Sequence, residues 1–440
     1  MHWLILLSLA FLATGNIQAQ ETIPMSLENC LQVGLERNKV LDAARAKTEG
    51  SLAASKLSRS AMLPSLKVSA SYSRLSDVPA FSITIPSFLS TQTMTISEPV
   101  LDNYSIKWTL QQPLFTGGRL IANNKTSKNN FLADSSDYNQ QYSDAGLNIR
   151  ILYWKLFLAG RIKELAQENV ILLEEHLKDV DNLAQQGMAT ENDKLKVKMQ
   201  LSNANLLLLE AENGLLTAGL HLNSYIGEPL GIIIEPTAVP DTSKATPTGF
   251  SDIMKKAQAG RADLKALRLR REAAHSGKKS AGAGWYPQVY AVGNYTYADP
   301  NQRIFPSKDQ FDGTWDVGVM LSMDIWNWQS TKHQVGQASA ALRQADDHLA
   351  LLEDAIEVEI RLALLELEKA VQKIEVTKTG LVQAEENYRN VKNMFRQGMA
   401  TNSDLLDAEV LLLQAKVNNT GAAVEYQIAK DKLKKATGEY

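Results

Sequence analysis

The feature that most constrains this chain is a five-residue string, Gln-Gly-Met-Ala-Thr, which occurs at 186–190 and again at 397–401. Each copy interrupts a long helical pattern and is followed three residues later by an aspartate, Asp193 or Asp404. Glycine readily takes the left-handed conformation that ends a helix. Threonine can accept a hydrogen bond from the exposed N–H groups of the next helix, and an aspartate favours that helix's positive end. Each string therefore predicts a tight turn between two antiparallel helices.

Similarity between the two halves of the chain extends well beyond these turns. A constant offset of 211 residues relates Phe115 to Trp326, Leu195 to Leu406, and Gly227 to Gly438. Upstream of residue 110 the offset rises to 223, so the first half carries 12 additional residues there. This self-similarity predicts an internal duplication, with a first repeat at 20–234 and a second at 250–440. Residues 235–249 hold three prolines among small polar residues and are predicted to be a linker.

Residues 1–19 are predicted to be a secretory signal peptide. Positions 4–13 are apolar apart from Ser8, and Ala19 supplies a small residue where signal peptidase would cleave. The segment before the apolar run has His2 in place of the usual lysine or arginine. The chain is therefore expected to be exported.

Composition excludes several classes of protein. The net charge of -3 provides no basic surplus, so nucleic acid is not an expected partner. The only cysteine, Cys30, cannot form an intramolecular disulfide, and its neighbours Glu28 and Asn29 do not fit a lipidation site. Beyond the N-terminus, no stretch approaches the roughly 18 apolar residues of a membrane-spanning helix. Soluble export and a β-barrel remain as alternatives.

Four segments alternate between apolar and polar residues and are predicted to be β-strands. They lie near 65–74 and 104–113 in the first repeat, and near 288–297 and 314–323 in the second. Strands of about ten residues with one apolar face are typical of transmembrane barrels. An ordinary half-buried antiparallel sheet would give the same alternation.

Aromatic residues near the ends of these segments favour the barrel, because aromatic girdles lie at the two membrane interfaces. Four strands cannot close a barrel, and an open edge in lipid would leave backbone groups unpaired. The chain is therefore predicted to oligomerise, although geometry alone does not choose the number of copies.

Two helices of roughly 65 residues are predicted, from Arg119 to Gln186 and from Ser330 to Gln397, each about 100 Å long. Apolar residues recur along them and along the helices that follow at spacings of three and four, which predicts coiled-coil packing. Before the first long helix, Pro113 is expected to stop the preceding strand. Gly117 and Gly118 would then permit a sharp turn from strand to helix.

The junction Gln112-Pro113-Leu114-Phe115-Thr116-Gly117-Gly118-Arg119 and the two Gly-x-x-Thr-x-x-Asp turns resemble those of the TolC-like outer-membrane efflux and secretion channels. The resemblance implies an α+β membrane protein, built as a homotrimer. Its twelve-stranded transmembrane β-barrel, with four strands per chain, would be continued by a long antiparallel coiled-coil α-helical barrel.

The same resemblance implies a location in the outer membrane of a Gram-negative bacterium, extending into the periplasm. The protein would be the passive conduit of a tripartite efflux or type I secretion system. Its expected partners are outer-membrane lipid, a periplasmic adaptor (membrane fusion) protein and an inner-membrane transporter of the RND or ABC type.

Site residues also follow from the resemblance. The residues expected to dock the adaptor lie at the helical tips: Gly187, Met188, Ala189, Thr190, Asp193, Gly398, Met399, Ala400 and Thr401. Asp404, Asp407 and Phe395 are expected to form a pore constriction, in which six carboxylates from three chains would favour cations. Family members with a latched entrance can carry a basic residue and a tyrosine where this chain has Ala400 and Phe395. The gate is therefore expected to rely on coiled-coil packing.

Two other functions are alternatives to the channel. An enzyme is disfavoured because the six histidines are scattered, without a His-Glu-x-x-His spacing, and no phosphate-binding loop or paired-cysteine motif occurs. No catalytic residue, cofactor or metal site is therefore predicted. The second alternative is a non-conducting trimeric outer-membrane scaffold or adhesin, which has little need for two identical tips on matched helices.

Overall fold

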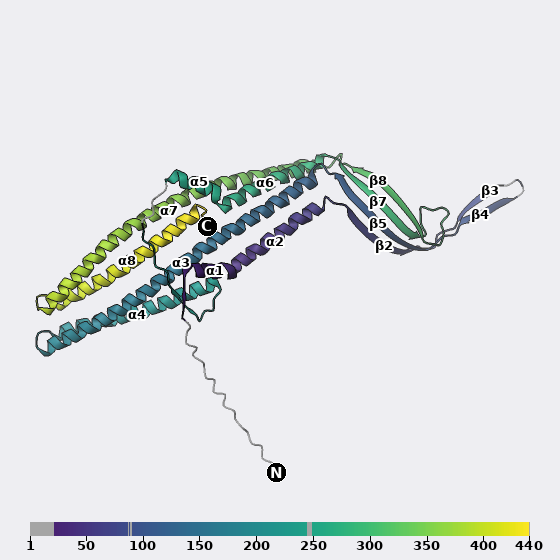
Figure 1. Cartoon of the computed structure of the whole chain (residues 1–440). Coiled ribbons are helices and arrows are strands. Elements are labelled where there is room, and N and C mark those ends of the chain that lie inside the picture. Colours follow the sequence, from purple (N-terminus) through teal and green to yellow (C-terminus); the bar gives the residue numbers. More distant parts are fainter. Residues whose placement is uncertain (1–21, 87, 89, 244–248, 440) are drawn as a thin grey trace, which may run out of the picture. The chain divides into compact units, whose positions relative to one another are not determined.

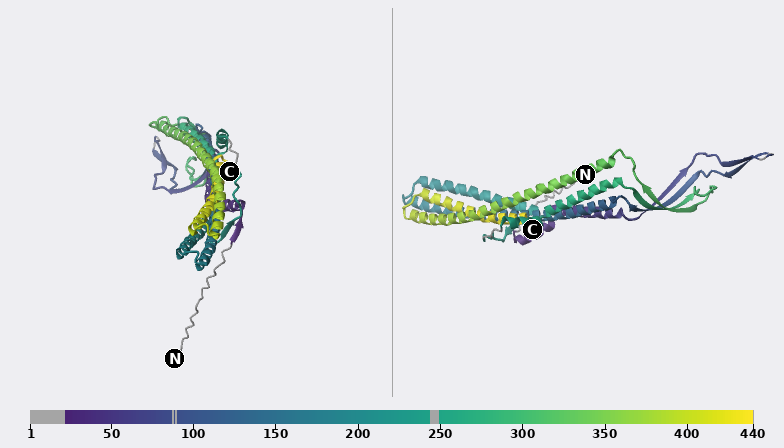
Figure 2. Two further views of the ribbon diagram at one scale, coloured as in Figure 1. Left: turned by 90° about the vertical axis from the view of Figure 1, so that its left-hand side faces the viewer. Right: turned by 90° about the horizontal axis from the view of Figure 1, so that it is seen from above.

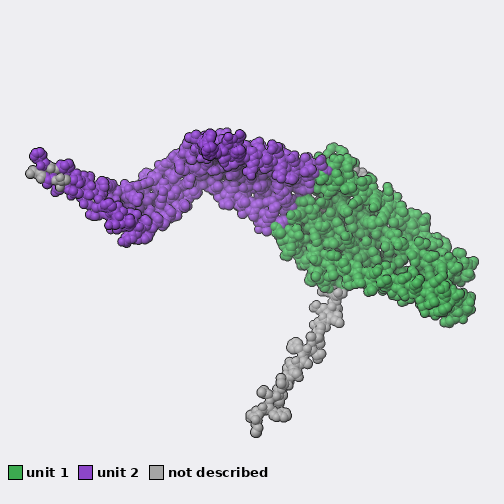
Figure 3. Space-filling view, turned by 180° about the vertical axis from the view of Figure 1, so that it is seen from behind, with its two compact units in different colours: residues 1–43, 139–261, 355–440 green, residues 44–138, 262–354 purple. Residues whose placement is uncertain are grey.

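The computed structural model describes residues 22–86, 88, 90–243 and 249–439 (Figure 1). The predicted signal peptide at 1–19 lies outside the described residues. The chain forms two compact units, which Figure 3 colours separately. Unit 1 comprises Met1–Ala43, Asn139–Arg261 and Ala355–Tyr440, and unit 2 comprises Ala44–Tyr138 and Ala262–Asp354. Each unit contains segments from both predicted repeats.

Helices make up most of the described chain. They are α1 (Leu27–Arg37), α2 (Lys39–Ser60), α3 (Arg119–Gln185), α4 (Glu191–Ile226), α5 (Phe250–Gly260), α6 (Ala262–Gly282), α7 (Ser330–Arg396) and α8 (Asn402–Ala436). The two longest, α3 and α7, each contain 67 residues. Within the described ranges, no helix carries an apolar stretch long enough to span a lipid bilayer.

Unit 1 holds two helical hairpins, in which α4 and α8 pair with the C-terminal parts of α3 and α7, and these hairpins lie side by side in both views of Figure 2. Val170 and Leu173 of α3 pack with Ala204 of α4, and Leu406 of α8 joins this cluster. A larger core surrounds Cys30, which is fully buried, and burial raises the pKa of its thiol to about 12. The Tyr153 hydroxyl in this core donates to the Met25 carbonyl at 3.0 Å. Near it, β1 (Thr22–Met25) pairs in parallel with β6 (Ile233–Pro236).

Unit 2 contains a four-stranded antiparallel sheet in the order β2-β5-β7-β8. Its strands are β2 (Ser65–Arg74), β5 (Asp102–Phe115), β7 (Gln288–Asp299) and β8 (Asp312–Ser322). Strands β2 and β8 are the two edges of this sheet. They carry unpaired backbone groups that another strand could bind.

The register of this sheet collects the apolar residues of all four strands on one face. Tyr72 pairs with Tyr104, Ile106 with Tyr297, and Tyr295 with Trp315. Because side chains alternate along a strand, these pairings also align Val68, Trp108 and Val317 on the same face. These side chains are not covered within the chain, as Trp315 is 74% and Val317 76% exposed. The sheet therefore presents an apolar surface.

One β-hairpin is absent from the sequence prediction. The segment between the first two predicted strands contains β3 (Phe81–Pro86), which pairs with β4 (Thr91–Ser97). These two strands have 6 and 7 residues, fewer than any strand of the four-stranded sheet. Pro79 precedes β3 and Pro86 is its last residue, and prolines in so short a segment are more typical of turns and loops.

Candidate functional site

The tips of the two helical hairpins have the same backbone geometry. Gly187 and Gly398 take φ values of 72° and 71°, in the left-handed region. Beyond each glycine, the next amide closes the turn, from Met188 to the Leu183 carbonyl at 2.8 Å and from Met399 to the Met394 carbonyl at 2.9 Å. A side chain at either glycine would strain the backbone, so the glycines are required for turns this tight.

A reciprocal capping box begins each returning helix. In the second hairpin, the Thr401 Oγ1 accepts from the Asp404 amide at 3.2 Å, and an Asp404 carboxylate oxygen accepts from the Thr401 amide at 2.8 Å. In the first hairpin, Thr190 Oγ1 likewise accepts from the Asp193 amide at 3.2 Å, and an Asp193 carboxylate oxygen accepts from the Thr190 amide at 3.1 Å. Hydrogen bonds from the threonine side chain and backbone lower the pKa of both aspartates. This is the geometry that the threonine and aspartate predict.

Each tip turn exposes one large apolar side chain, a methionine. Met188 is 66% and Met399 62% exposed, whereas the adjacent Ala189 and Ala400 are half-buried. Methionine is flexible and polarisable, and it adapts to varied apolar partners. The tips therefore offer two matched apolar contacts.

The three residues expected at the constriction have different surroundings. Asp404 is exposed, but its carboxylate also serves the capping box. Asp407 lies about one turn further along α8 and is exposed. The half-buried ring of Phe395 contacts the ring of His176 edge to face, with 5.5 Å between centroids.

Sequence reasoning missed a buried contact between the two hairpins. His176 of α3 and Glu409 of α8 are 4% and 3% exposed, and His176 Nδ1 lies 3.1 Å from Glu409 Oε2. Two further bonds link the hairpins, from Lys196 Nζ to Ser403 Oγ at 3.0 Å and from Asn402 Nδ2 to the Asp193 carbonyl at 3.2 Å. We call these three contacts the hairpin clasp.

The sequence does contain a signal for His176. Leu173, His176 and Val180 follow one another at spacings of three and four, and all three are buried. A polar residue within such an apolar seam needs a partner on the facing helix. The Glu409 partner could not be chosen from sequence, because it lies 233 positions away.

The strand-to-helix junction in unit 2 departs from one expectation. Pro113 does not end the ladder, because β5 continues to Phe115 through a register shift that accommodates the proline. Gly117 and Gly118 have φ values of 62° and 83°. A Cβ on Gly117 would lie 2.7 Å from the Ala283 carbonyl oxygen, so no larger residue fits without movement.

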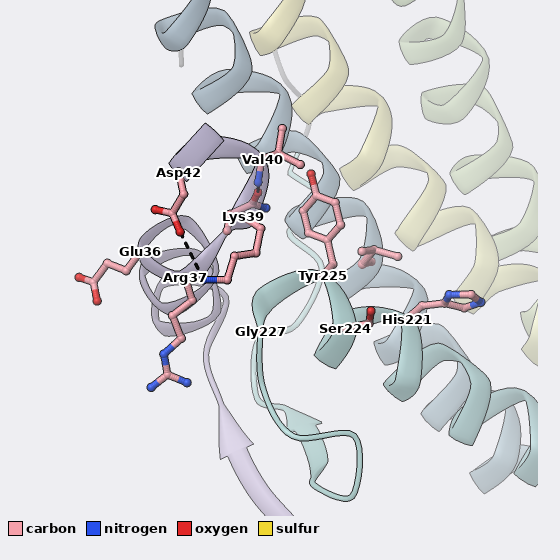
Figure 4. Close-up of a pocket in the computed structure, with 11 residues that line it drawn as sticks. Glu36, Arg37, Lys39, Val40, Asp42, His221, Ser224, Tyr225 and Gly227 are labelled. Carbon is pink, nitrogen blue, oxygen red and sulfur yellow. Dashed lines mark hydrogen bonds and ion pairs between the residues drawn. The ribbon is translucent and has the colours of Figure 1, made fainter. Parts of the chain in front are cut away.

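A cavity of about 740 Å³ lies in unit 1 where α1 meets α2 and α4 ends (Figure 4). Two basic side chains that line it have acidic partners, because Arg37 is bound to Glu228 at 2.6 Å and Lys39 lies 3.4 Å from Asp42. It contains none of the sequence-predicted site residues. Among the described residues, no group of three or more His, Cys, Asp and Glu side chains is arranged to hold a metal ion.

Comparison with known proteins gives a consistent result. The family model for outer membrane efflux proteins matches residues 30–228 and 253–439, which is most of the chain. No curated protein matches it by sequence.

Solved structures share the fold. The chain is similar to CusC, with 17% identity, a TM-score of 0.80, and coverage of 94% of this chain and 92% of CusC. It is also similar to the Campylobacter jejuni outer membrane channel CmeC, with 18% identity, a TM-score of 0.79, and 94% and 85% coverage. The chain is similar as well to the open state of the Neisseria gonorrhoeae outer membrane channel MtrE, with 18% identity, a TM-score of 0.76, and coverage of 94% of this chain and 88% of MtrE. The resemblance found in the sequence is confirmed, and the chain belongs to the outer membrane efflux protein family.

Proposed function

We propose that this protein is the passive conduit of a tripartite efflux or type I secretion system, acting as a homotrimer in the outer membrane of a Gram-negative bacterium. The observation that carries the proposal is the sheet of unit 2, which has one apolar face and two unpaired edges. Membership of an outer membrane efflux family supports the location and the class of transport.

The sheet has the two faces that a channel wall in lipid requires. Its apolar face would contact lipid, and pairing β8 of one copy with β2 of the next would satisfy the open edges. The opposite face carries a polar network, in which Thr109 Oγ1 donates to Asn294 Oδ1 at 3.0 Å and Asn294 Nδ2 donates to Asp316 at 2.9 Å. Three copies would supply twelve strands around a polar, water-filled lumen.

The helices of unit 1 also need partners outside the chain. An apolar stripe runs along α4 at spacings of three, four and seven, and its members are each about half exposed: Leu195, Met199, Leu206, Leu209, Leu216 and Leu220. Such a stripe is stable when a second helix covers it. In the proposed trimer that helix comes from a neighbouring copy, which extends the duplicated hairpins into a helical barrel.

The two tips are the proposed docking points for a periplasmic adaptor. Met188 and Met399 protrude from turns of the same geometry, so one adaptor surface could contact both. An inner-membrane transporter of the RND or ABC type would supply the energy. Asp404 and Asp407, with Phe395, form the proposed constriction, and the conduit itself has no catalytic step or cofactor.

A non-conducting scaffold or adhesin would share the apolar face and the apolar stripe. The polar network on the other face of the sheet favours a water-filled interior over a solid apolar one, in which polar groups are costly to bury. The two functions are separated by electrical recording.

The test begins with native mass spectrometry of the mature protein in detergent, followed by single-channel recording in planar bilayers. A trimer that conducts supports the conduit. A silent trimer is compared with the clasp variant His176→Ala, because a channel shut at rest would conduct once the contact between the hairpins is weakened. A trimer that stays silent in both forms contradicts the conduit and favours the scaffold.

A further inference from the structure

The β3–β4 hairpin presents an exposed apolar surface that the proposed conduit does not use. In Figure 1 the hairpin extends beyond the end of the four-stranded sheet that is remote from α3. Its apolar residues, the hairpin patch, are each at least two-fifths exposed: Phe81, Ile83, Ile85, Met94 and, in the turn, Phe88. At its base, Phe81 contacts Phe305 of the β7–β8 loop edge to face at 5.7 Å.

The hairpin is amphipathic and uncharged. The register pairs Ile83 with Met94 on the apolar side, and Thr84 with Thr93 on the other, where their hydroxyl oxygens lie 3.4 Å apart. No Asp, Glu, Lys or Arg occurs from Val78 to Ser97. Proteins often protect exposed strands from association with charged residues, and an isolated two-stranded hairpin is only marginally stable in water. The threonine hydroxyls on one face can be solvated by water, whereas the apolar face is more stable when another apolar surface packs on it.

We propose that the hairpin patches of neighbouring copies pack against one another and cap the outer mouth of the channel. This inference rests on the proposed homotrimer. The hairpin connects β2, which ends at Arg74, to β5, which begins at Asp102, so every copy in a closed ring sends its hairpin from the same end of the sheet. Rotational symmetry places the same residues of each copy at the same level around the axis. A second copy therefore offers a partner that is apolar, uncharged and placed at the same level.

Two neighbouring positions on opposite faces of β3 provide the test. Ile83→Cys lies in the hairpin patch, and Thr84→Cys lies on the hydroxyl face. The native Cys30 is fully buried and does not interfere. After mild oxidation of the full-length mature protein in proteoliposomes, Ile83→Cys is expected to give a disulfide-linked dimer on a non-reducing gel. Thr84→Cys and the wild type are expected to give only the monomer band.

The outcomes separate this inference from the proposed function. A native trimer in which Ile83→Cys does not cross-link, or in which Thr84→Cys cross-links equally, overturns the cap and leaves the conduit intact. A protein that is monomeric by native mass spectrometry overturns both. Quenching of a bimane label on Ile83→Cys by brominated lipids, with no quenching on Thr84→Cys, also overturns the cap and assigns the patch to the lipid surface.

Conductance supplies an independent readout. Replacing Ile83 and Ile85 by aspartate places like charges on every copy within the proposed cap, which is expected to drive the hairpins apart and raise the single-channel conductance. Ser82→Asp/Thr84→Asp introduces the same charge on the hydroxyl face and is the matched control. An equal effect of the two double variants would contradict packing through the apolar face.

Discussion

At the scale of single residues, Asp404 caps the start of α8 within one chain. Its carboxylate accepts hydrogen bonds from the Thr401 amide at 2.8 Å and from Thr401 Oγ1 at 2.6 Å, and these bonds lower its pKa. Because the folded-state pKa lies below the ordinary value of 3.8, the stabilisation is fully present above that value. It is lost as the pH falls through the lowered value, so the start of α8 is expected to be insensitive to pH above about 4.

Thr401→Ala is expected to loosen the start of α8, because the side-chain oxygen that accepts the Asp404 amide is removed. Loss of such a cap typically costs about 1 kcal/mol. Hydrogen–deuterium exchange of the amides at 402–405 should therefore become faster. Thr190→Ala is the matched control and should accelerate exchange only at the start of α4. Unchanged exchange at 402–405 would show that the cap is not needed there.

Asp407→Asn tests the proposed constriction without disturbing the cap. If three copies of Asp407 face the pore, loss of their charge should reduce cation selectivity, measured as the reversal potential across a bilayer with a salt gradient. Asp193→Asn removes the same charge from the capping aspartate at the tip of the first hairpin, and we expect it to leave the reversal potential unchanged. An equal shift in both variants would argue against a constriction formed by the second hairpin alone.

At the scale of elements, the two hairpins are joined by a polar contact inside an apolar seam. A buried pair favours one arrangement of its helices, because separating it leaves each group without a hydrogen bond. Figures 1 and 2 show the hairpins as neighbours along their length. Movement of one hairpin relative to the other would therefore have to break the bond between His176 and Glu409.

His176→Ala and Glu409→Ala are each expected to increase the open probability of the channel. The lost contact is worth about 1–3 kcal/mol, and each 1.4 kcal/mol changes an equilibrium by about tenfold. In single-channel recordings the double variant should resemble either single variant, because both remove the same interaction. Lys416→Ala is the control, because it removes a more exposed ion pair between the same two hairpins, with Glu168 of α3, and such a pair should contribute little. Additive effects of the two buried substitutions would contradict a shared contact.

At the scale of the whole molecule, one chain leaves two kinds of surface incomplete. The edges β2 and β8 lack neighbouring strands, and the apolar stripe of α4 is exposed. Both deficits are satisfied if identical copies close a ring, since a ring has no free edge. In the proposed channel, oligomerisation is therefore part of reaching a stable state in the membrane.

Cysteine pairs across the proposed contact between copies test this closure. Ser71→Cys in β2 is combined in turn with Thr314→Cys, Asp316→Cys or Gly318→Cys in β8, all on the polar face. One pair is expected to produce covalent trimers after oxidation. Val317→Cys, whose side chain lies on the apolar face, should not cross-link with Ser71→Cys. Cross-linking by none of the three pairs, in a protein that is monomeric by mass spectrometry, would contradict the ring.

Features that depend on near neighbours in the chain follow from the amino-acid sequence alone. Glycine, threonine and aspartate within seven residues specify each tip turn, and the two-residue period specifies strands with one apolar face. The family follows from these local motifs, because they recur in a fixed order. Contacts between strands and helices that are distant in the sequence are known only from the tertiary structure.

Three contacts between separate parts of the chain could not be predicted from local sequence. The registers of β2 with β5, β5 with β7, and β7 with β8 place four apolar faces together, and the pairing of β5 with β7 carries the ladder past Pro113. The β3–β4 hairpin is stabilised by cross-strand pairs that its short, proline-flanked sequence does not reveal. His176 meets Glu409 across two hairpins. Local sequence sets backbone conformation through sterics and nearby hydrogen bonds, whereas these contacts depend on which surfaces meet when the chain packs.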